Sequence, residues 1–324
     1  MFHGRIDEAT ARGLRTLRGR IEKAGIPSSC LDETIILATW NIREFGRKRR
    51  SKRAIHYIAE ILGQFDLIAV TELRDNLTDL RRVMEILGPY WNVVFSDFNT
   101  DAGGNRERIA YLFDKRAVVF TGLASEADPP RKKDPATGEY LPALGWWRSP
   151  FMASFSAGNF DFIVLTAHIR WGSGTSARLA PLKLLADWVD DRSREKHVLD
   201  KDWVVVGDFN IPSTRSSLFR AVSRNGLTLP PALANVAHKD AASNLARNKR
   251  YDQILHMSEE SFSLTGKAGV LDFYKGDWRS LFPADEFPAL TKSKFTYEIS
   301  DHLPLWVELD LRVTEEKLDQ ILED

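Results

Sequence analysis

Residues 203–212 read WVVVGDFNIP, an apolar run that ends abruptly in polar residues. The β-branched residues in its first half are typical of a buried central strand. We expect Gly207 to let the backbone turn tightly where this strand ends. Asp208 and Asn210 would then be presented at the rim of a sheet, while Phe209 packs inward. Because ligands of α/β proteins bind at strand ends, this stretch predicts a functional site.

Around this stretch, strand-like and helix-like segments alternate along the chain. Some strand pairs follow each other without a helix, so the pattern favours mixed sheets covered by helices. A Pro-, Gly- and charge-rich loop is expected over about 122–145, and a polar helical tail is expected up to Asp324. The predicted strands are 35–40, 66–73, 91–96, 108–113, 151–156, 161–169, 203–209, 251–256 and 303–311, and the predicted helices are 51–63, 77–88 and 177–192.

The N-terminal part of the chain is predicted to be a helical extension, residues 1–30, before one main domain over residues 31–324. Leu14, Leu17 and Ile21 recur at helical spacing until a Gly-Ile-Pro sequence stops the pattern. The helix either packs on the main domain or binds a partner, and we favour packing. No repeat, low-complexity tract or linker divides the rest of the chain.

Composition narrows the class of protein. The chain has 324 residues, of which 43% are hydrophobic and 28% charged, and its 45 basic residues balance its 45 acidic residues. This balance excludes a protein that is basic overall, although a local basic face is allowed. Cys30 is the only cysteine, so no internal disulfide can form. The N-terminus has no apolar core of signal-peptide length, and no later run reaches membrane-spanning length, which predicts a soluble, cytoplasmic protein.

Several other apolar runs also end in polar side chains. Each of these residues alone is more often a turn former, a cap or a structural histidine than a ligand. Together they are hard to explain structurally, because a buried polar group without a partner costs about 1–3 kcal/mol. Oxygen ligands of this kind suit a divalent cation such as Mg²⁺, and histidines titrate near neutral pH. The residues are Asn41, Glu72, His168, Asp208, Asn210, Asp252, Asp301 and His302.

The motifs formed by these residues resemble the endonuclease/exonuclease/phosphatase superfamily, and within it most closely deoxyribonuclease I. The matching blocks, in order, are NIREFG, TELRDN, RERIAYLFDKRAV, WWRSPFMASF, GDFN, RYDQIL and ISDHLP. They span roughly residues 35–310. The resemblance implies a four-layer α/β sandwich, in which two mixed β-sheets pack face to face with helices outside. It also implies phosphodiester hydrolysis that depends on a divalent metal.

The resemblance further implies roles for individual residues. Glu72, Asn41, Asp208 and Asp301 would hold Mg²⁺, with Mn²⁺ as a second option, and Asp208 and Asn210 would orient the phosphate and the attacking water. Two His–carboxylate pairs are implied, His302 with Asp252 and His168 with Glu107. In such a pair the carboxylate fixes the imidazole tautomer and favours its cation, so the ring can move a proton. We favour His302 as the base.

Three arginines match family positions near the substrate: Arg43, Arg74 and Arg148. A surface salt bridge is the alternative for each. The basic run at residues 47–53 supplies either phosphate contacts or a solvated helix start.

The chain also departs from deoxyribonuclease I. Asn105 stands where that enzyme has a tyrosine against the DNA sugar, and without disulfides its calcium sites are not expected. Trp146 and Trp147 adjoin Arg148 and have three possible roles: stacking on unpaired bases, packing in the core, or dipping into a membrane surface.

The leading functional interpretation is a DNA endonuclease with little sequence preference, because phosphate contacts carry no sequence information. The sequence leaves open whether the DNA is single- or double-stranded. The alternative is a phosphoesterase of the same superfamily that acts on a lipid or a small phosphoester, as a sphingomyelinase or an inositol-phosphate phosphatase does. A non-catalytic binding module is least favoured, because none of the implied metal or proton-transfer residues is missing.

Overall fold

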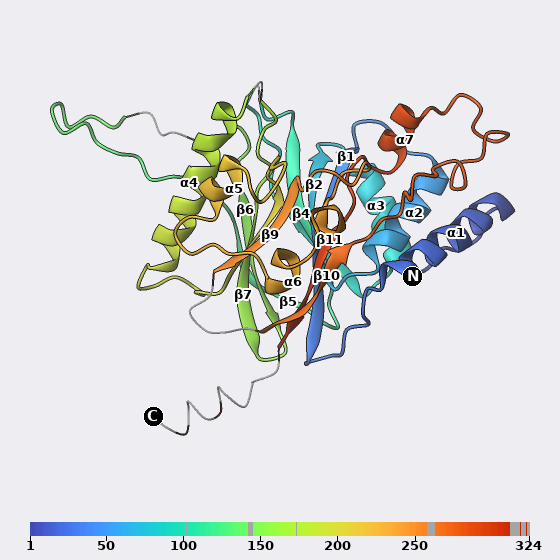
Figure 1. The fold of residues 1–324 in the computed structure, drawn as a ribbon, viewed down its shortest axis with the longest axis horizontal. Helices are drawn as coiled ribbons and strands as arrows, with labels where there is room; N and C mark the ends of the chain where they lie inside the picture. The colour runs from blue at the N-terminus through green and yellow to red at the C-terminus, as the bar shows by residue number, and fades with distance from the viewer. Residues whose placement is uncertain are drawn as a thin grey trace.

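The computed structural model describes residues 1–101, 103–141, 145–172, 174–257, 263–311, 318 and 322. Within these residues the chain forms two mixed β-sheets with helices on their outer faces (Figure 1). The first sheet has six strands in the order β10-β11-β1-β2-β4-β3, and the second has five in the order β5-β6-β7-β8-β9. The predicted fold class is therefore confirmed.

The strands have the following bounds: β1 Thr34–Phe45, β2 Leu67–Arg74, β3 Trp91–Phe95, β4 Glu107–Asp114, β5 Val119–Glu126, β6 Phe151–Ala157, β7 Phe160–Thr166, β8 Trp203–Asp208, β9 Asp252–Met257, β10 Ser263–Val270 and β11 Leu305–Asp310. Each sheet contains one parallel pair, β1 with β2 and β7 with β8, and its other neighbours are antiparallel. A helix connects the strands of each parallel pair, because parallel neighbours need a crossover connection.

The helices cover the outer faces of the two sheets, which gives four layers (Figure 1). Helices α2 and α3 lie outside the six-stranded sheet, and α4 and α5 lie outside the five-stranded sheet. The helices are α1 Glu8–Ala24, α2 Lys52–Leu62, α3 Thr78–Leu87, α4 Ser176–Ser193, α5 Ser217–Val222, α6 Pro231–Ala234, the 3-10 helix η1 His238–Ala241 and α7 Lys292–Glu298.

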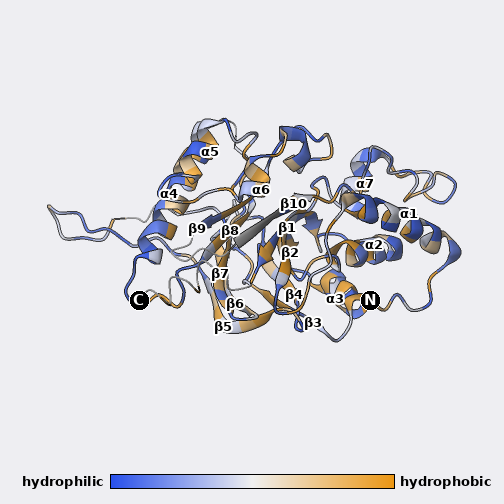
Figure 2. Cartoon of the chain, turned by 60° about the horizontal axis from the view of Figure 1, so that its bottom comes forward, coloured by the Kyte–Doolittle hydropathy of each residue, from blue (hydrophilic) through white to orange (hydrophobic). Residues whose placement is uncertain are grey.

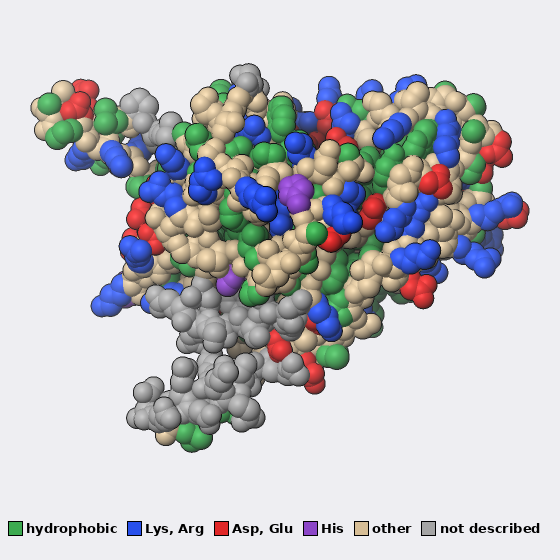
Figure 3. Space-filling view, in the orientation of Figure 1, with side chains coloured by type: hydrophobic (Ala, Val, Ile, Leu, Met, Phe, Trp, Pro, Cys, Tyr) green, Lys and Arg blue, Asp and Glu red, His purple; other side chains and the backbone are tan. Residues whose placement is uncertain are grey.

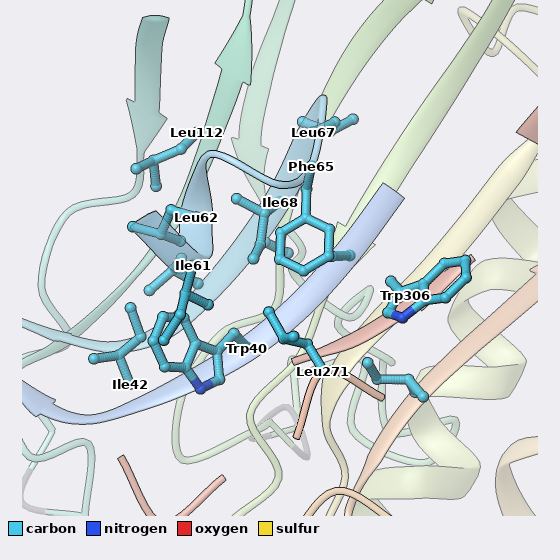
Figure 4. Close-up of a cluster of buried hydrophobic side chains, with 14 of the residues drawn as sticks. Trp40, Ile42, Ile61, Leu62, Phe65, Leu67, Ile68, Leu112, Leu271 and Trp306 are labelled. Atoms are coloured by element: carbon cyan, nitrogen blue, oxygen red, sulfur yellow. The ribbon is translucent and has the colours of Figure 1, made fainter. Parts of the chain in front are cut away.

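Two hydrophobic clusters hold these layers together. The larger fills the space between the sheets and under α1 to α3, and the smaller lies between α4 and the five-stranded sheet. Figure 4 shows part of the larger cluster, in which Trp40 packs among apolar side chains from β2 and α2. Figure 2 shows hydrophobic residues concentrated in the central strands and hydrophilic residues on the outward surfaces of the helices. This burial drives folding and fixes the strands that carry the site.

The N-terminal helix α1 packs directly on the body of the protein. Leu14, Leu17 and Ile21 are buried. Arg20 is also buried, and its guanidinium donates to the carbonyl oxygens of Phe273, at 2.7 Å, and other nearby residues. These contacts agree with the packing role favoured for the helix.

Six elements were not predicted from the sequence, among them the short helices α5, α6 and η1. Strand β5 occupies part of the segment expected to be a loop, and β10 and α7 lie in segments without a predicted element. The remainder of the loop projects from the body and contains a bridge between Lys133 and Tyr140 (Figure 1). Most of the predicted polar tail lies outside the described residues.

Candidate active site

A hydrogen-bonded triad joins the two sheets at one end of the molecule. Asn41 projects from β1 in the first sheet, and its Nδ2 atom donates to Glu72 Oε1 and to Asp208 Oδ2, both at 3.0 Å. Glu72 belongs to β2, and Asp208 is the last residue of β8 in the second sheet. Residues separated by up to 167 positions therefore meet in one site.

The backbone of β2 is irregular at Glu72. Residues 71–72 form an irregularity in the pairing of β2 with β4, and the register with β1 also shifts next to them. Glu72 itself has a φ of 62°, and Asn210 has a φ of 53°, which is uncommon outside glycine. Bulges and positive φ angles are often found beside active sites, where they aim a side chain away from the regular pleat.

Two His–carboxylate pairs lie on either side of Asp208. His168 Nδ1 is 2.7 Å from Glu107 Oε2, and His302 Nδ1 is 2.7 Å from Asp252 Oδ2. The opposite ring nitrogens face inward: Nε2 of His168 and Nε2 of His302 lie 3.6 and 3.8 Å from the same oxygen, Asp208 Oδ2. The structure therefore brings together both predicted pairs, with their free nitrogens directed at one carboxylate.

The charges in this cluster shift the pKa values of its members. Burial would lower the pKa of His302, but the carboxylates of Asp252 and Asp208 raise it well above its usual value. Burial would raise the pKa of Glu107, but His168 and two arginines lower it to about 2. Burial also works against the charge on Glu72, yet His168 keeps the Glu72 pKa below its usual value. Burial raises the pKa of Asp208, although His302 opposes this shift.

Gly207 has a different role from the turn expected from the sequence. It lies inside β8 with a φ of 129°, and a Cβ atom at this position would overlap the carbonyl oxygen of Ala167. The glycine therefore allows β8 to approach the segment that carries His168, where Ile169 N also bonds to Asp208 O at 2.8 Å. The predicted inward packing of Phe209 is confirmed, since its side chain is fully buried.

Asn210 faces the same site, and its amide is held by a neighbouring backbone. Its Nδ2 atom donates to Ile169 O at 2.7 Å, and its backbone N–H donates to Asp208 Oδ1 at 2.9 Å. Neither of these two hydrogen bonds uses the side-chain oxygen of Asn210.

The three predicted arginines all line the cleft, in two different settings. Arg148 Nε lies 2.9 Å from Glu107 Oε2, and Arg74 Nη1 lies 3.7 Å from Glu107 Oε1. Arg43 Nη1 lies 3.4 Å from Asp301 Oδ2 at the more exposed rim. The buried Nη1 atom of Arg148 has no hydrogen-bond partner among the described residues.

The cleft that contains these residues has a volume of about 570 Å³. Sequence reasoning missed four residues of its wall: Glu44, Gly103, and Arg170 and Trp171, which follow His168 closely in the chain. It also missed Tyr251, whose ring lies 5.9 Å from that of His302. Arg170 and Trp171 could have been predicted from their closeness to His168 in the sequence, and Tyr251 from its position before Asp252.

The basic run at residues 47–53 is only partly available to a substrate. Arg50 and Arg53 are buried, and the Arg50 guanidinium donates to the carbonyl oxygens of Glu298 and Arg43. Arg47, Lys48 and Arg49 remain exposed. Figure 3 shows other Lys and Arg side chains spread over one face of the molecule among acidic ones. The run is therefore not a uniform phosphate-binding patch.

The two adjacent tryptophans have separate roles in the structure. Trp146 is buried beside α4 and donates from Nε1 to Pro181 O at 3.0 Å. Trp147 is 49% exposed and packs against Gly103. Of the two tryptophans, only Trp146 therefore packs in the core.

The residues present fit a divalent cation. Asn41 Oδ1 is buried and has no hydrogen-bond partner among the described residues, while Nδ2 of the same amide donates to the Glu72 carboxylate. Asp208, Asp252 and His302 form a second group close enough to hold a metal. In that group Asp252 Oδ2 bonds to His302, but Asp252 Oδ1 has no hydrogen-bond partner among the described residues, so each group offers one uncommitted oxygen. Asp301 lies at the rim of the same cleft, with its side chain 40% exposed.

The sequence model of the endonuclease/exonuclease/phosphatase family matches residues 38–302. The chain belongs to this family. Its members are hydrolytic enzymes that act on phosphoesters, typically with divalent metal ions. The match runs from Ala38 within β1 to His302, and so includes every residue of the two His–carboxylate pairs.

Several solved structures have the same fold as this chain. A conserved protein of unknown function from Enterococcus faecalis is 16% identical, covers 85% of this chain and 99% of its own, and gives a TM-score of 0.55. A humanized TDP2 from D. rerio is 14% identical, with 85% and 98% coverage and a TM-score of 0.54. The human Nocturnin catalytic domain is 15% identical, with 87% and 96% coverage and a TM-score of 0.51. At these identities the likeness shows the fold alone.

Two further comparisons bear on the protein as a whole. No curated protein matches the sequence significantly. Among the described residues, no helix combines the length and the apolar character that crossing a membrane requires.

Proposed function

We propose that this protein is a divalent-metal-dependent phosphodiester hydrolase that cleaves DNA with little sequence preference. The observation that carries the proposal is the convergence of two His–carboxylate pairs on Asp208, with their Nε2 atoms 3.6 and 3.8 Å from one oxygen. This arrangement places two proton-transfer groups on either side of one position, as hydrolysis of a phosphodiester requires. The resemblance of the motifs to deoxyribonuclease I supports DNA as the substrate.

Glu72, Asn41 and Asp208 would hold the metal, with Asp301 at the rim as a further oxygen ligand. Carboxylate and amide oxygens are the ligands that Mg²⁺ prefers, and Mn²⁺ accepts the same set. When bound, the ion supplies positive charge that stabilises the phosphate in the transition state.

The two histidines would exchange protons with the water and the leaving group. Asp252 holds Nδ1 of His302, which leaves Nε2 directed into the cleft, and Glu107 does the same for His168. We assign His302 as the base that accepts the proton of the attacking water, and His168 as the acid that gives a proton to the leaving oxygen. Asp208 and Asn210 would orient the water and the phosphate between them.

The arginines would bind the phosphates of the substrate. The buried Nη1 donor of Arg148 supports this role, because it has no hydrogen-bond partner among the described residues and a phosphate oxygen would satisfy it. Arg74 lies beside the same carboxylate, and Arg43 is positioned at the rim. These contacts reach only the phosphates, so they do not select a base sequence.

A substrate panel tests the proposal. The wild-type protein is incubated with supercoiled plasmid, single-stranded DNA, RNA and sphingomyelin, with Mg²⁺ or Mn²⁺ and then with a chelator. We expect DNA cleavage that the chelator abolishes. Cleavage of sphingomyelin alone would assign the protein to lipid phosphodiesters, and no turnover of any substrate would contradict an enzymatic role.

Matched variants connect this activity to the site. We expect His302→Ala and Asp208→Asn each to abolish cleavage while the circular-dichroism spectrum stays that of the wild type. His238→Ala and Asp240→Asn are the controls, because both residues are exposed on η1 and do not line the cleft. Wild-type turnover in His302→Ala would overturn the assignment.

A further inference from the structure

Two large aromatic side chains are exposed at the cleft. Trp171 lines the cleft and is 57% exposed, and Trp147, which is 49% exposed, packs against Gly103 of the cleft wall. Indole side chains are usually buried in large part, and exposed apolar groups that border a groove often mark a binding site. Neither residue has a role in the chemistry proposed above.

Trp171 is held in a defined place relative to the reacting groups. The guanidinium carbon of Arg178 lies 4.6 Å from the centre of its ring, and Arg178 also donates to Asn210 O at 2.5 Å. The ring of Tyr251 meets Trp171 edge-on at 5.6 Å, and Tyr251 in turn adjoins His302. Trp171 is therefore connected to both Asn210 and His302 through one residue each.

Trp147 reaches the same wall from a different loop. Its ring packs against Gly103, and the guanidinium carbon of Arg170 lies 4.5 Å from its centre. Gly103 and Arg170 both line the cleft. Arg170 is exposed, so its charge is available to a ligand.

We propose that Trp171 and Trp147 stack on unpaired bases of the substrate, and that the protein acts on single-stranded DNA or on duplex ends with unpaired nucleotides. This inference rests on the proposed function. Aromatic side chains beside a basic groove are the usual means of holding single strands, because every base has a face on which an indole can stack. In an intact duplex these faces are covered by neighbouring base pairs.

The surroundings of the two rings favour bases over a lipid surface. An arginine lies over each ring, and the neighbours of Trp171 are polar groups of the site. A guanidinium next to an exposed ring suits the alternation of phosphate and base along a strand. Insertion into a membrane would instead bring these guanidinium groups into an apolar environment.

Steady-state kinetics on matched substrates tests the proposal. The substrates are an oligo(dT) strand and a blunt duplex that contains the same strand, and the variants are Trp171→Ala, Trp147→Ala and Trp171→Phe. Tyr140→Ala is the control, because Tyr140 is 63% exposed and lies on the projecting loop rather than in the cleft. We expect each alanine variant to raise the KM for the single strand about tenfold, a loss typical of one stacked base. Phenylalanine should restore most of the loss, and the control should behave as the wild type.

The ratio of single-strand to duplex cleavage distinguishes the possible outcomes. A fall in this ratio in the alanine variants supports stacking. An equal loss on both substrates, or no loss on either, overturns it while leaving the proposed function intact. If the wild type cleaves neither DNA, the proposed function itself fails. If the tryptophan variants lose only the hydrolysis of sphingomyelin in vesicles, the two indoles bind a membrane and the stacking proposal is wrong.

Binding without turnover gives an independent measurement. His302→Ala is combined with Trp171→Ala, and the fluorescence anisotropy of labelled oligo(dT) is measured in the presence of a chelator. We expect the affinity to fall about tenfold relative to His302→Ala alone. Equal affinity would contradict the proposed stacking.

Discussion

Nδ2 of Asn41 lies 3.0 Å from Oδ2 of Asp208, and this hydrogen bond joins the two β-sheets at the cleft. Asn41 belongs to the six-stranded sheet and Asp208 to the five-stranded sheet. Both atoms are buried, so the bond is made in an environment where an unpaired amide or carboxylate is costly. The geometry of the site therefore depends on a contact between the two sheets.

Replacement of Asn41 by alanine should weaken both the fold and the activity. We expect the free energy of unfolding to fall by about 1–3 kcal/mol, because Asp208 and Glu72 each lose a buried hydrogen bond. Urea denaturation measures this loss, and DNA cleavage should fall with it. Thr39→Val is the control on the same strand, since the Thr39 hydroxyl is buried without a hydrogen-bond partner among the described residues. A variant of Asn41 as stable and active as Thr39→Val would contradict the bridging role.

Gly207→Ala should be much more harmful than alanine at a glycine that has room around it. Both Gly207 and Gly122 have positive φ angles, 129° and 113°. A Cβ atom at Gly122 would meet nothing within 4 Å, whereas at Gly207 it would overlap Ala167. We expect Gly122→Ala to cost about 1 kcal/mol and Gly207→Ala to cost at least twice that and abolish activity. Thermal unfolding of both variants compares the two effects, and equal losses would show that the close approach is unimportant.

Asp252→Asn should slow catalysis through His302. The amide keeps the size of the side chain but does not stabilise the imidazole in its charged form. We expect kcat to fall on the order of 10²–10⁴-fold, with Asp240→Asn as the exposed control. In the double variant with His302→Ala, the two losses should not add, because both residues act as one unit. Additive losses would show that Asp252 acts independently of His302.

The stability of the protein should depend on pH through His56, a buried residue of α2 that contacts His3 in the N-terminal segment. Burial lowers the pKa of His56 to about 4 from a model-compound value of 6.5, and the adjacent His3, 3.0 Å away between the two Nδ1 atoms, adds to this. Below pH 6.5 the unfolded chain takes up a proton that the folded protein does not, so stability is complete above this pH and falls as the pH decreases.

We expect the free energy of unfolding to drop by about 2 kcal/mol through His56 between about pH 7.5 and about pH 5. Urea denaturation at both values measures the difference. In His56→Gln this part of the pH dependence should disappear. A variant with the same pH dependence as the wild type would contradict the assignment to His56.

The sequence predicted the strands with strong apolar patterns and missed those stabilised mainly by a neighbour. Strands β5 and β10 lie at sheet edges. Most residues of β5 are exposed or half-buried, and β10 contains two glycines, so neither has the alternation that identifies a strand. Helix α7 is short and polar, and its sequence KSKFTYE gives no apolar periodicity.

The sequence predicted that the side chains of the site come together, but not the reason for their proximity. Asp252 and His302 do not end strands but lie at or just before the starts of β9 and β11. They reach the site because these strands run antiparallel to β8 and β1, whose far ends lie beside them. Burial of Arg50 among backbone carbonyls could not be predicted, because the sequence shows its charge but not the carbonyl oxygens that neutralise it.

The central claim is that Asn41 and Glu72 hold a divalent metal ion on which hydrolysis depends. Anomalous diffraction from a crystal soaked in Mn²⁺ tests this most directly. We predict one strong peak in contact with the Glu72 carboxylate and Asn41 Oδ1, and its loss in Glu72→Ala. A peak held instead by Asp252 and His302, or no peak in the cleft of an active crystal, would contradict the account.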